Sequence, residues 1–450
     1  MLLEFHPDAA RRFEQLGTEL RGMLRSISRK NLSHASDSFH PDVVPSLTIN
    51  EHNVVDVPYV EKVNQLSMVT QQVLFDDGTH AFELGEGGCE YLAKLVEAIQ
   101  RSGQVKQMVS MATLRTNILE WLNPSKNDSR TLPQQLSQEI SPLIQAGTAW
   151  VPIASLCLQS PLSFAGYTMQ PITAAQFDTW ETGASQGDPA KFERLRHYFK
   201  SEREKYQGLS AITLEFEAEP QRAYELAIDV ADRVVTLLRT FCIENLHPNA
   251  CSFVVPFGNL ALISDHAWLL DHNGHISKQR SLLKPPFPTS WVIADEHMTQ
   301  LQEMGLEELS TVAATPNPND FQEKLLSALL IYNRANVTRE PIDKLVYILV
   351  SLETMLLRNR SEPIQANLGD RLAFMVGSNV DECVAIVSLV KDCYAIRSDY
   401  IHHGNSLKDI AALEKFFMYC WVFFTRLIRS QKQFTTNASF FDYFDRRKFQ

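Results

Sequence analysis

Two residues five positions apart, Arg397 and His402, have the types best suited to chemistry in this chain of 450 residues. Histidine can take and give protons near neutral pH. The planar guanidinium of arginine can bind a phosphate through parallel hydrogen bonds. Together the two side chains could serve phosphodiester cleavage without a metal ion. The spacing alone is weakly specific, because about one such pair would arise by chance in a chain of this length.

The pair is predicted to lie near the C-terminal end of a helix over residues 381–402, where apolar residues recur at helical spacing. A five-residue step turns about 140° around a helix, so the two side chains flank a groove and do not stack. The helix dipole favours the charged form of a histidine at this end. A structural interpretation also stays open: Arg397 pairs with Glu353 or Asp399, and His402 caps backbone carbonyls.

Helical patterns continue through the C-terminal part of the chain. Residues 315–320 (Thr-Pro-Asn-Pro-Asn-Asp) are predicted to form a boundary, because two prolines cannot continue a helix and Asp320 suits an N-cap. Pro341 suits a first helical turn, and Gly404 suits a helix stop. The apolar periodicity then predicts helices at about 321–335, 341–359, 365–376, 381–402 and 408–430. We therefore expect an all-α helical domain over residues 316–450.

Residues 1–310 are predicted to form an α+β region, with room for two subdomains and a break near 148–210. An amphipathic helix pattern covers residues 8–29, and residues 211–217 alternate as a half-buried strand does before a helix at about 219–244. Two turn sequences predict β-hairpins, because Asp-Gly and Asn-Gly favour tight turns. They are Asp76-Asp77-Gly78 and His272-Asn273-Gly274-His275.

The formal charge of −11 excludes a general nucleic-acid coating protein, which would be basic. The charge is uneven along the chain. Residues 316–450 contain 17 Lys and Arg against 15 Asp and Glu, a balance of +2, so the remainder carries −13. The C-terminal part is therefore the part that could tolerate an anionic substrate.

The cysteines and apolar runs predict a cytoplasmic protein. The seven cysteines are odd in number and none has CxxC spacing, which favours reduced thiols over disulfides or a zinc finger. The N-terminal residues lack the pattern of a signal peptide. The most apolar run, Phe416–Phe424, is too short to cross a bilayer. It is apolar all around a helix, so we expect it in a core or a subunit interface.

Three segments of the C-terminal part occur in a characteristic order. Residues 341–359 contain Ser-Leu-Glu353, residues 367–375 contain Arg-Leu-Ala, and residues 389–404 contain Tyr394-Ala-Ile-Arg397-Ser398-Asp-Tyr-Ile-His402. This order resembles the HEPN superfamily, and most closely its Apea-like branch. That branch usually has glycine directly after the histidine, whereas His403 intervenes here. His402 keeps the spacing of the motif, and His403 stays an alternative.

The resemblance implies a dimeric helical bundle that brings two Arg-x4-His motifs to one cleft. It implies a metal-independent endoribonuclease that needs no cofactor. In this chemistry the RNA 2′-hydroxyl attacks the adjacent phosphate and leaves a 2′,3′-cyclic phosphate and a 5′-hydroxyl. His402 would transfer protons, and Arg397 would bind the phosphate and stabilise the transition state. Ser398 and Tyr394 match the motif, and Glu353 is expected to orient Arg397.

Proteins of this class often act in bacterial anti-phage (abortive-infection) or toxin systems. The acidic region 1–310 is then expected to restrain the nuclease until a phage-derived or protein trigger acts on it. One alternative is a non-catalytic HEPN dimer that binds nucleic acid, a nucleotide or a protein partner. Another places the activity in residues 1–310, with a metal ion at the second hairpin. The ligands there would be Asp265, His266, Asp271, His272 and His275, but their spacing matches no known ligand pattern, so no metal is expected.

Overall fold

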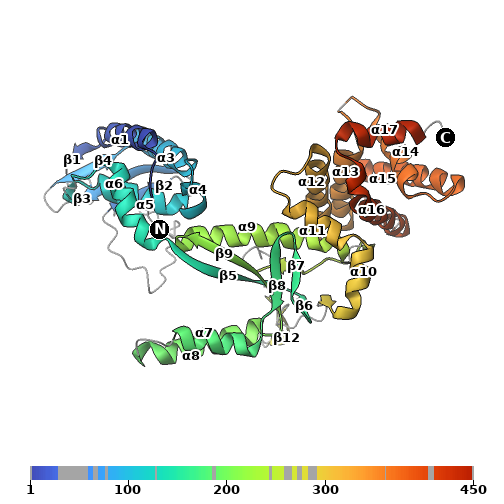
Figure 1. Cartoon of the computed structure of the whole chain (residues 1–450), viewed down its shortest axis with the longest axis horizontal. Helices are drawn as coiled ribbons and strands as arrows, with labels where there is room; N and C mark the ends of the chain where they lie inside the picture. Colours follow the sequence, from blue (N-terminus) through green and yellow to red (C-terminus); the bar gives the residue numbers. More distant parts are fainter. Residues whose placement is uncertain are drawn as a thin grey trace. The chain divides into compact units, whose positions relative to one another are not determined.

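The structure is a computed structural model. It describes residues 3–28, 59–63, 69–76, 80–126, 129–184, 189–242, 246–257, 266–270, 276–281, 291–359, 361–403 and 410–447. Two compact units result, residues 1–149 with 215–226 and residues 150–214 with 227–450. Strands occur up to Ile293, and helices form the described chain from Met298 to Arg447 (Figure 1). The predicted order, an α+β region followed by an all-helical region, is confirmed.

The first unit packs helices against a four-stranded antiparallel sheet of order β1-β4-β3-β2. Val73 and Phe75 of β3 are fully buried against Leu92 and Leu114 from the helices, as a sheet covered on one face requires. The strands are β1 Arg25–Ile27, β2 Tyr59–Val63, β3 Thr70–Asp76 and β4 Ala81–Leu84. The helices are α1 Pro7–Arg21, α3 Glu86–Gln100, α4 Val105–Met108, α5 Met111–Leu122 and α6 Leu132–Ile140, with 3-10 turns η1 Pro124–Lys126 and η2 Ser141–Leu143.

The sequence predicted some of these elements, among them the first helix and the hairpin at Asp76. The hairpin at Asp76 is confirmed, since β3 pairs with β4 in antiparallel register. The helix expected over residues 8–29 is shorter than predicted. It ends at Arg21, and residues 25–27 pair with β4 as a strand instead.

Further along the chain lie a five-stranded sheet of order β10-β5-β9-β8-β7 and two smaller strand pairs, β11-β12 and β13-β6. Strands β5 and β9 and the helix α9 include residues of both units, and the other strands belong to the second unit. The strand predicted at residues 211–217 is confirmed as β9. The helix predicted to reach residue 244 ends as α9 at Leu238 and continues as a 3-10 turn to Phe241. The strands are β5 Gln145–Ala154, β6 Leu156–Leu158, β7 Leu162–Phe164, β8 Tyr167–Pro171, β9 Ser210–Ala218, β10 Val255–Pro256, β11 His266–Leu270, β12 Ile276–Ser281 and β13 Trp291–Ile293. The helices of this part are α7 Ala174–Ala184, α8 Pro189–Tyr206 and α9 Pro220–Leu238, with η3 Arg239–Phe241.

Within its described residues, the helical region of the second unit contains the five helices that the sequence predicts, α12 to α16, and three more. As expected, a helix (α12) begins directly after the Asn-Pro boundary. Its N-cap, however, is Asn319 and not Asp320. The Asn319 side chain accepts the Gln322 N–H at 2.9 Å, and Gln322 accepts the Asn319 N–H at 3.1 Å. The helices are α10 Met298–Glu303, α11 Leu306–Ala314, α12 Asp320–Ala335, α13 Pro341–Leu356, α14 Ile364–Val376, α15 Val380–His403, α16 Ile410–Ser430 and α17 Asn437–Arg447, with η5 Asp295–His297 and η6 Gln431–Gln433.

The apolar run of α16 lies mostly in the core of this helical region. Phe416, Phe417, Phe423 and Phe424 are fully buried, whereas Met418 is 43% exposed. The ring of Phe424 packs 4.8 Å from that of Tyr332 on α12. The prediction that this helix is buried is therefore confirmed for most of its residues.

Buried polar contacts join the helical region to the residues that follow α9. The Asn333 amide donates to the Thr240 hydroxyl at 2.8 Å, and the Trp421 indole N–H donates to the Thr240 carbonyl at 2.9 Å. The Lys344 ammonium, almost fully buried, donates to the carbonyls of His247 and Ala250. These contacts place the expected boundary at residue 316 inside the second unit, which begins well before it.

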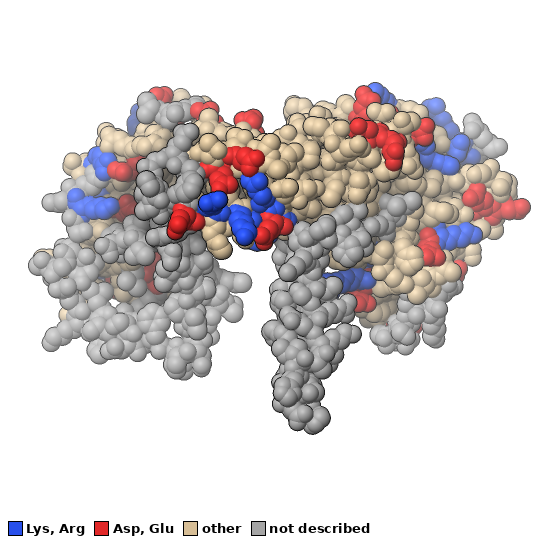
Figure 2. Space-filling model, turned by 90° about the horizontal axis from the view of Figure 1, so that it is seen from below, with Lys and Arg blue, Asp and Glu red and all other residues tan. Residues whose placement is uncertain are grey.

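The described surface is mixed in charge. On the face drawn in Figure 2, Lys and Arg residues lie interspersed with Asp and Glu residues. No helix in the described part of the chain is both long enough and apolar enough to span a membrane.

Candidate functional site

Two neighbouring helices carry the residues that the sequence singled out. Glu353 lies in the last turn of α13, and Tyr394, Arg397, Ser398 and His402 follow one another along the C-terminal half of α15. Both helices also carry fully buried apolar side chains, Leu352 and Met355 on α13 and Val390 and Cys393 on α15. The core therefore fixes where the polar residues stand.

Glu353 is the point at which these residues meet. The Tyr394 hydroxyl donates a hydrogen bond of 2.7 Å to Glu353 Oε1. Arg397 Nη1 lies 3.8 Å from the same oxygen. The expectation that Glu353 neighbours Arg397 agrees with this geometry. The sequence had placed Tyr394 only as a member of the motif, and its hydroxyl contact was not predicted.

The environment keeps Tyr394 a hydrogen-bond donor. Burial raises the pKa of Tyr394 far above its ordinary value, and the hydrogen bond and charge of Glu353 raise it further, while Arg397 lowers it. The phenol is consequently protonated throughout the physiological range. Its O–H holds one oxygen of the Glu353 carboxylate in place.

Arg397 makes a weaker contact with Glu353 than Tyr394 does. Its contact with Glu353 is an ion pair at a distance longer than a hydrogen bond. The side chain is 31% exposed, while its Nε atom is buried and has no hydrogen-bond partner in the described structure. Guanidinium has five N–H donors, so one distant carboxylate oxygen leaves it capacity to bind an anion.

The remaining motif residues lie toward the end of α15. Ser398 and His402 are exposed, and α15 continues as a helix through His403. The side chain of His403 and residues 404–409 are outside the described part, so the predicted stop at Gly404 is too. Helix geometry separates Arg397 from His402 by about 7.5 Å along the axis and about 140° around it. One chain therefore does not direct both side chains to one point.

A metal site finds no support in the described residues. They contain no group of three or more His, Cys, Asp or Glu side chains that could hold a metal ion. The strands of the second predicted hairpin are present as β11 and β12 in antiparallel register. Four of its candidate ligands lie outside the described residues, as does the side chain of His266.

A cavity lined by three arginines was not predicted. Arg426 and Arg429 from α16 and Arg447 from α17 surround it. The only sequence signal is the placement of these residues at or near the last turns of their helices, where arginine is common because it complements the helix dipole. That signal does not distinguish a binding site from a helix cap.

Comparisons with known proteins found no similar protein. No family model matches the chain, and no curated protein or solved structure matches it. The interpretation of the α13–α15 residues therefore depends on the motif and on the geometry around Glu353.

Proposed function

We propose that the chain is a metal-independent endoribonuclease of the HEPN type, which cleaves RNA through Arg397 and His402. The observation that carries the proposal is the shared Glu353 oxygen. Tyr394 donates to it at 2.7 Å and Arg397 approaches it at 3.8 Å, five residues before the exposed His402. Arginine and histidine are groups that can serve phosphodiester cleavage without a metal, the arginine by binding the phosphate and the histidine by transferring protons.

The reaction is an internal transesterification. The RNA 2′-oxygen loses its proton and forms a bond to the adjacent phosphorus. The bond from phosphorus to the 5′-oxygen breaks, and that oxygen receives a proton. The products are a 2′,3′-cyclic phosphate and a 5′-hydroxyl. His402 transfers the protons, and Arg397 binds the non-bridging oxygens, where charge grows in the transition state.

A dimer completes the site. Because helix geometry turns His402 about 140° away from Arg397, one copy positions the two groups on different sides of α15. Two copies of α15 packed together would bring an arginine of one near a histidine of the other. The acidic residues of the N-terminal region would then restrain the nuclease until a phage-derived or protein trigger releases it, as in bacterial abortive infection or toxin systems.

The test is cleavage of defined RNAs by the full chain in the presence of a metal chelator. Arg397→Ala and His402→Ala are expected to abolish cleavage, because each removes a group that acts on the phosphate. The matched control is Arg334→Ala, which removes an exposed arginine from α12. His403→Ala separates the two candidate histidines. Products that end in a 2′,3′-cyclic phosphate support the proposal, and unchanged cleavage by both site variants would overturn it.

The ion pair itself favours a second candidate function. Arg397 already faces the Glu353 carboxylate, as a structural arginine does. In that case the chain is a non-catalytic HEPN dimer that binds nucleic acid, a nucleotide or a protein partner. The test uses purified wild-type protein, with each candidate trigger added in turn. Binding of RNA without any cyclic-phosphate ends would favour this second function.

A further inference from the structure

A cavity of the second unit is lined by the β7–β8 turn, the C-terminal half of α9 and the end of α11. All of its lining residues belong to this unit, and none of them is a candidate nuclease residue. Its volume is about 420 Å³, within the range of small-molecule sites. Most of the lining is aliphatic, and these residues are Ala165, Val230, Val234, Leu237, Ala313 and Ala314.

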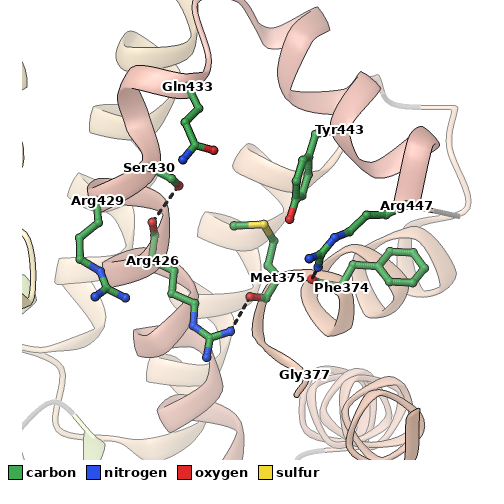
Figure 3. Close-up of a pocket in the computed structure, with 9 residues that line it drawn as sticks. All are labelled: Phe374, Met375, Gly377, Arg426, Arg429, Ser430, Gln433, Tyr443 and Arg447. Carbon is green, nitrogen blue, oxygen red and sulfur yellow. Dashed lines mark hydrogen bonds between the residues drawn. The ribbon is translucent and has the colours of Figure 1, made fainter. Parts of the chain in front are cut away.

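Two charged side chains of α9, Asp229 and Arg233, also line this cavity. Within the described part of the chain, no hydrogen bond or ion pair involves either side chain. The arginine cavity differs in this respect. Figure 3 shows Arg426 directed at the Met375 carbonyl, to which it donates at 2.8 Å. The unpaired charges of opposite sign on α9 are instead available to a ligand that carries both signs itself.

The spacing of Asp229 and Arg233 places both charges on one face of α9. Four residues rise about 6 Å along a helix and turn about 40° beyond one full turn. An acidic residue four positions before a basic one can form an ion pair, but such an exposed pair is weak. It therefore competes poorly with a ligand that forms a charge-assisted hydrogen bond to each side chain. An α-amino acid has its ammonium and carboxylate groups on one carbon atom, so it can meet both side chains at once.

The β7–β8 turn gives the cavity an apolar wall. Ala165 and Gly166 connect the two strands with φ of +55° and +83°. Asn-Gly is a preferred pair for such left-handed backbone, because alanine is strained there. Ala165 accepts this strain and places a methyl group where asparagine would place a polar amide. Its N–H donates to the Ser310 hydroxyl at 2.9 Å, which holds the turn against α11. This wall therefore suits an aliphatic side chain of the ligand.

We propose that this cavity binds a free α-amino acid with a branched aliphatic side chain. The ammonium group donates to Asp229, and the carboxylate accepts parallel hydrogen bonds from the Arg233 guanidinium. The aliphatic side chain lies against Ala165, Val234 and Ala313, where removal of apolar surface from water favours binding. A phosphate would be repelled by Asp229, and a simple cation by Arg233. Nothing in this inference depends on RNA cleavage.

The experiment measures binding to the full chain by titration calorimetry. The probes are L-leucine, L-leucinamide, which lacks the carboxylate, and N-acetyl-L-leucine, which lacks the ammonium group. The variants are Asp229→Asn and Arg233→Gln, both at exposed positions that the fold should tolerate. The matched controls are Asp232→Asn on α9 and Arg334→Gln on α12, which remove exposed charges outside the cavity.

The expected result is that L-leucine binds, and that each cavity variant weakens its binding about tenfold or more while the controls do not. Both blocked analogues should bind more weakly than L-leucine to the wild-type chain. L-leucinamide should bind equally to the wild-type chain and to Arg233→Gln, because it has no carboxylate for the arginine. N-acetyl-L-leucine should likewise not distinguish Asp229→Asn from the wild-type chain.

Three results would overturn the proposal: no binding of L-leucine, equal binding of L-leucine to wild type and both cavity variants, or equal binding of L-leucine and both blocked analogues. Binding of the peptide Leu-Gly-Gly without binding of L-leucine would assign the cavity to a peptide N-terminus and overturn the free amino acid. Because none of these measurements involves cleavage, an inactive nuclease leaves their outcome unaffected.

Discussion

The Tyr394 hydroxyl and the Glu353 carboxylate join α15 to α13 through a hydrogen bond of 2.7 Å, next to Arg397. The bond depends on a buried phenol whose raised pKa keeps its proton in place. It links the packing of the two helices to the orientation of the arginine that would bind the scissile phosphate.

Tyr394→Phe removes this hydrogen bond while keeping the ring. We expect the free energy of unfolding to fall by about 1–3 kcal/mol, because the bond goes to a charged group. RNA cleavage should fall by at most about tenfold, since Arg397 remains but is positioned less well. Urea unfolding and initial cleavage rates measure the two effects. The control is Tyr400→Phe on the exposed side of α15, for which both quantities should stay unchanged.

Glu362 and Arg371 predict a pH dependence of stability. Arg371 donates to both Glu362 oxygens at 2.8 Å, and the Glu362 side chain is 15% exposed. Hydrogen bonds from Arg371 lower the pKa of Glu362 from 4.5 to about 2. The carboxylate therefore stabilises the fold above pH 4.5, and this contribution is lost as the pH falls toward 2.

Glu362→Gln should lower the free energy of unfolding at pH 7 by about 3 kcal/mol, and the difference from wild type should shrink between pH 4.5 and 2. Urea unfolding of both proteins across this range gives the comparison. Glu204→Gln, an exposed position on α8, serves as the control and should show no such pH-dependent difference. A constant difference at every pH would show that the ionised pair is not the cause.

Two glycines should respond in opposite ways to alanine. Gly305 precedes α11 with φ +103°, and an added Cβ would lie 2.9 Å from Ile428 Cγ2. Gly305→Ala should therefore destabilise the fold by more than about 1 kcal/mol. Gly87 lies within α3 with no atom near an added Cβ, so Gly87→Ala should stabilise by about 0.5–1 kcal/mol. Thermal unfolding of the two variants shows whether each substitution raises or lowers stability.

The sequence predicted those elements whose pattern is local. Helices α12 to α16 follow from apolar periodicity, and Pro341 and the Asn-Pro boundary locate two of their starts. The boundary at residue 316 was placed by the same local signals, yet long-range contacts such as Asn333 with Thr240 group earlier residues with the helices. Periodicity carries no information about a hydrogen bond across 93 positions.

The same distinction holds for the candidate site. The spacing identified Arg397 and His402 because they share one helix, and Glu353 was a candidate partner of Arg397. The resemblance added Tyr394. The arginine cavity was missed, because Arg447 comes from α17 and no pattern predicted that helix or its position. Helix α17, from Asn437 to Arg447, is short and polar on most sides. A helix of this length depends on packing against the rest of the fold to stay helical.

The docking of α17 provides the last prediction. Phe440 is fully buried, with its ring centroid 5.1 Å from those of Phe321 and Phe434. The Asn437 N–H also donates to the Asp320 carboxylate at 3.0 Å. Phe440→Ala should lower the free energy of unfolding by about 3–5 kcal/mol, since it removes an aromatic side chain from a closed core.

The same change should release α17 from the helical region. Hydrogen exchange would then rise in residues 437–447 before the rest of the helical region, because α17 alone is too short to be a stable helix. The exposed Thr435→Ala is the control and should not alter exchange. Protection of residues 437–447 that survives Phe440→Ala would mean that α17 is held by contacts other than this aromatic cluster.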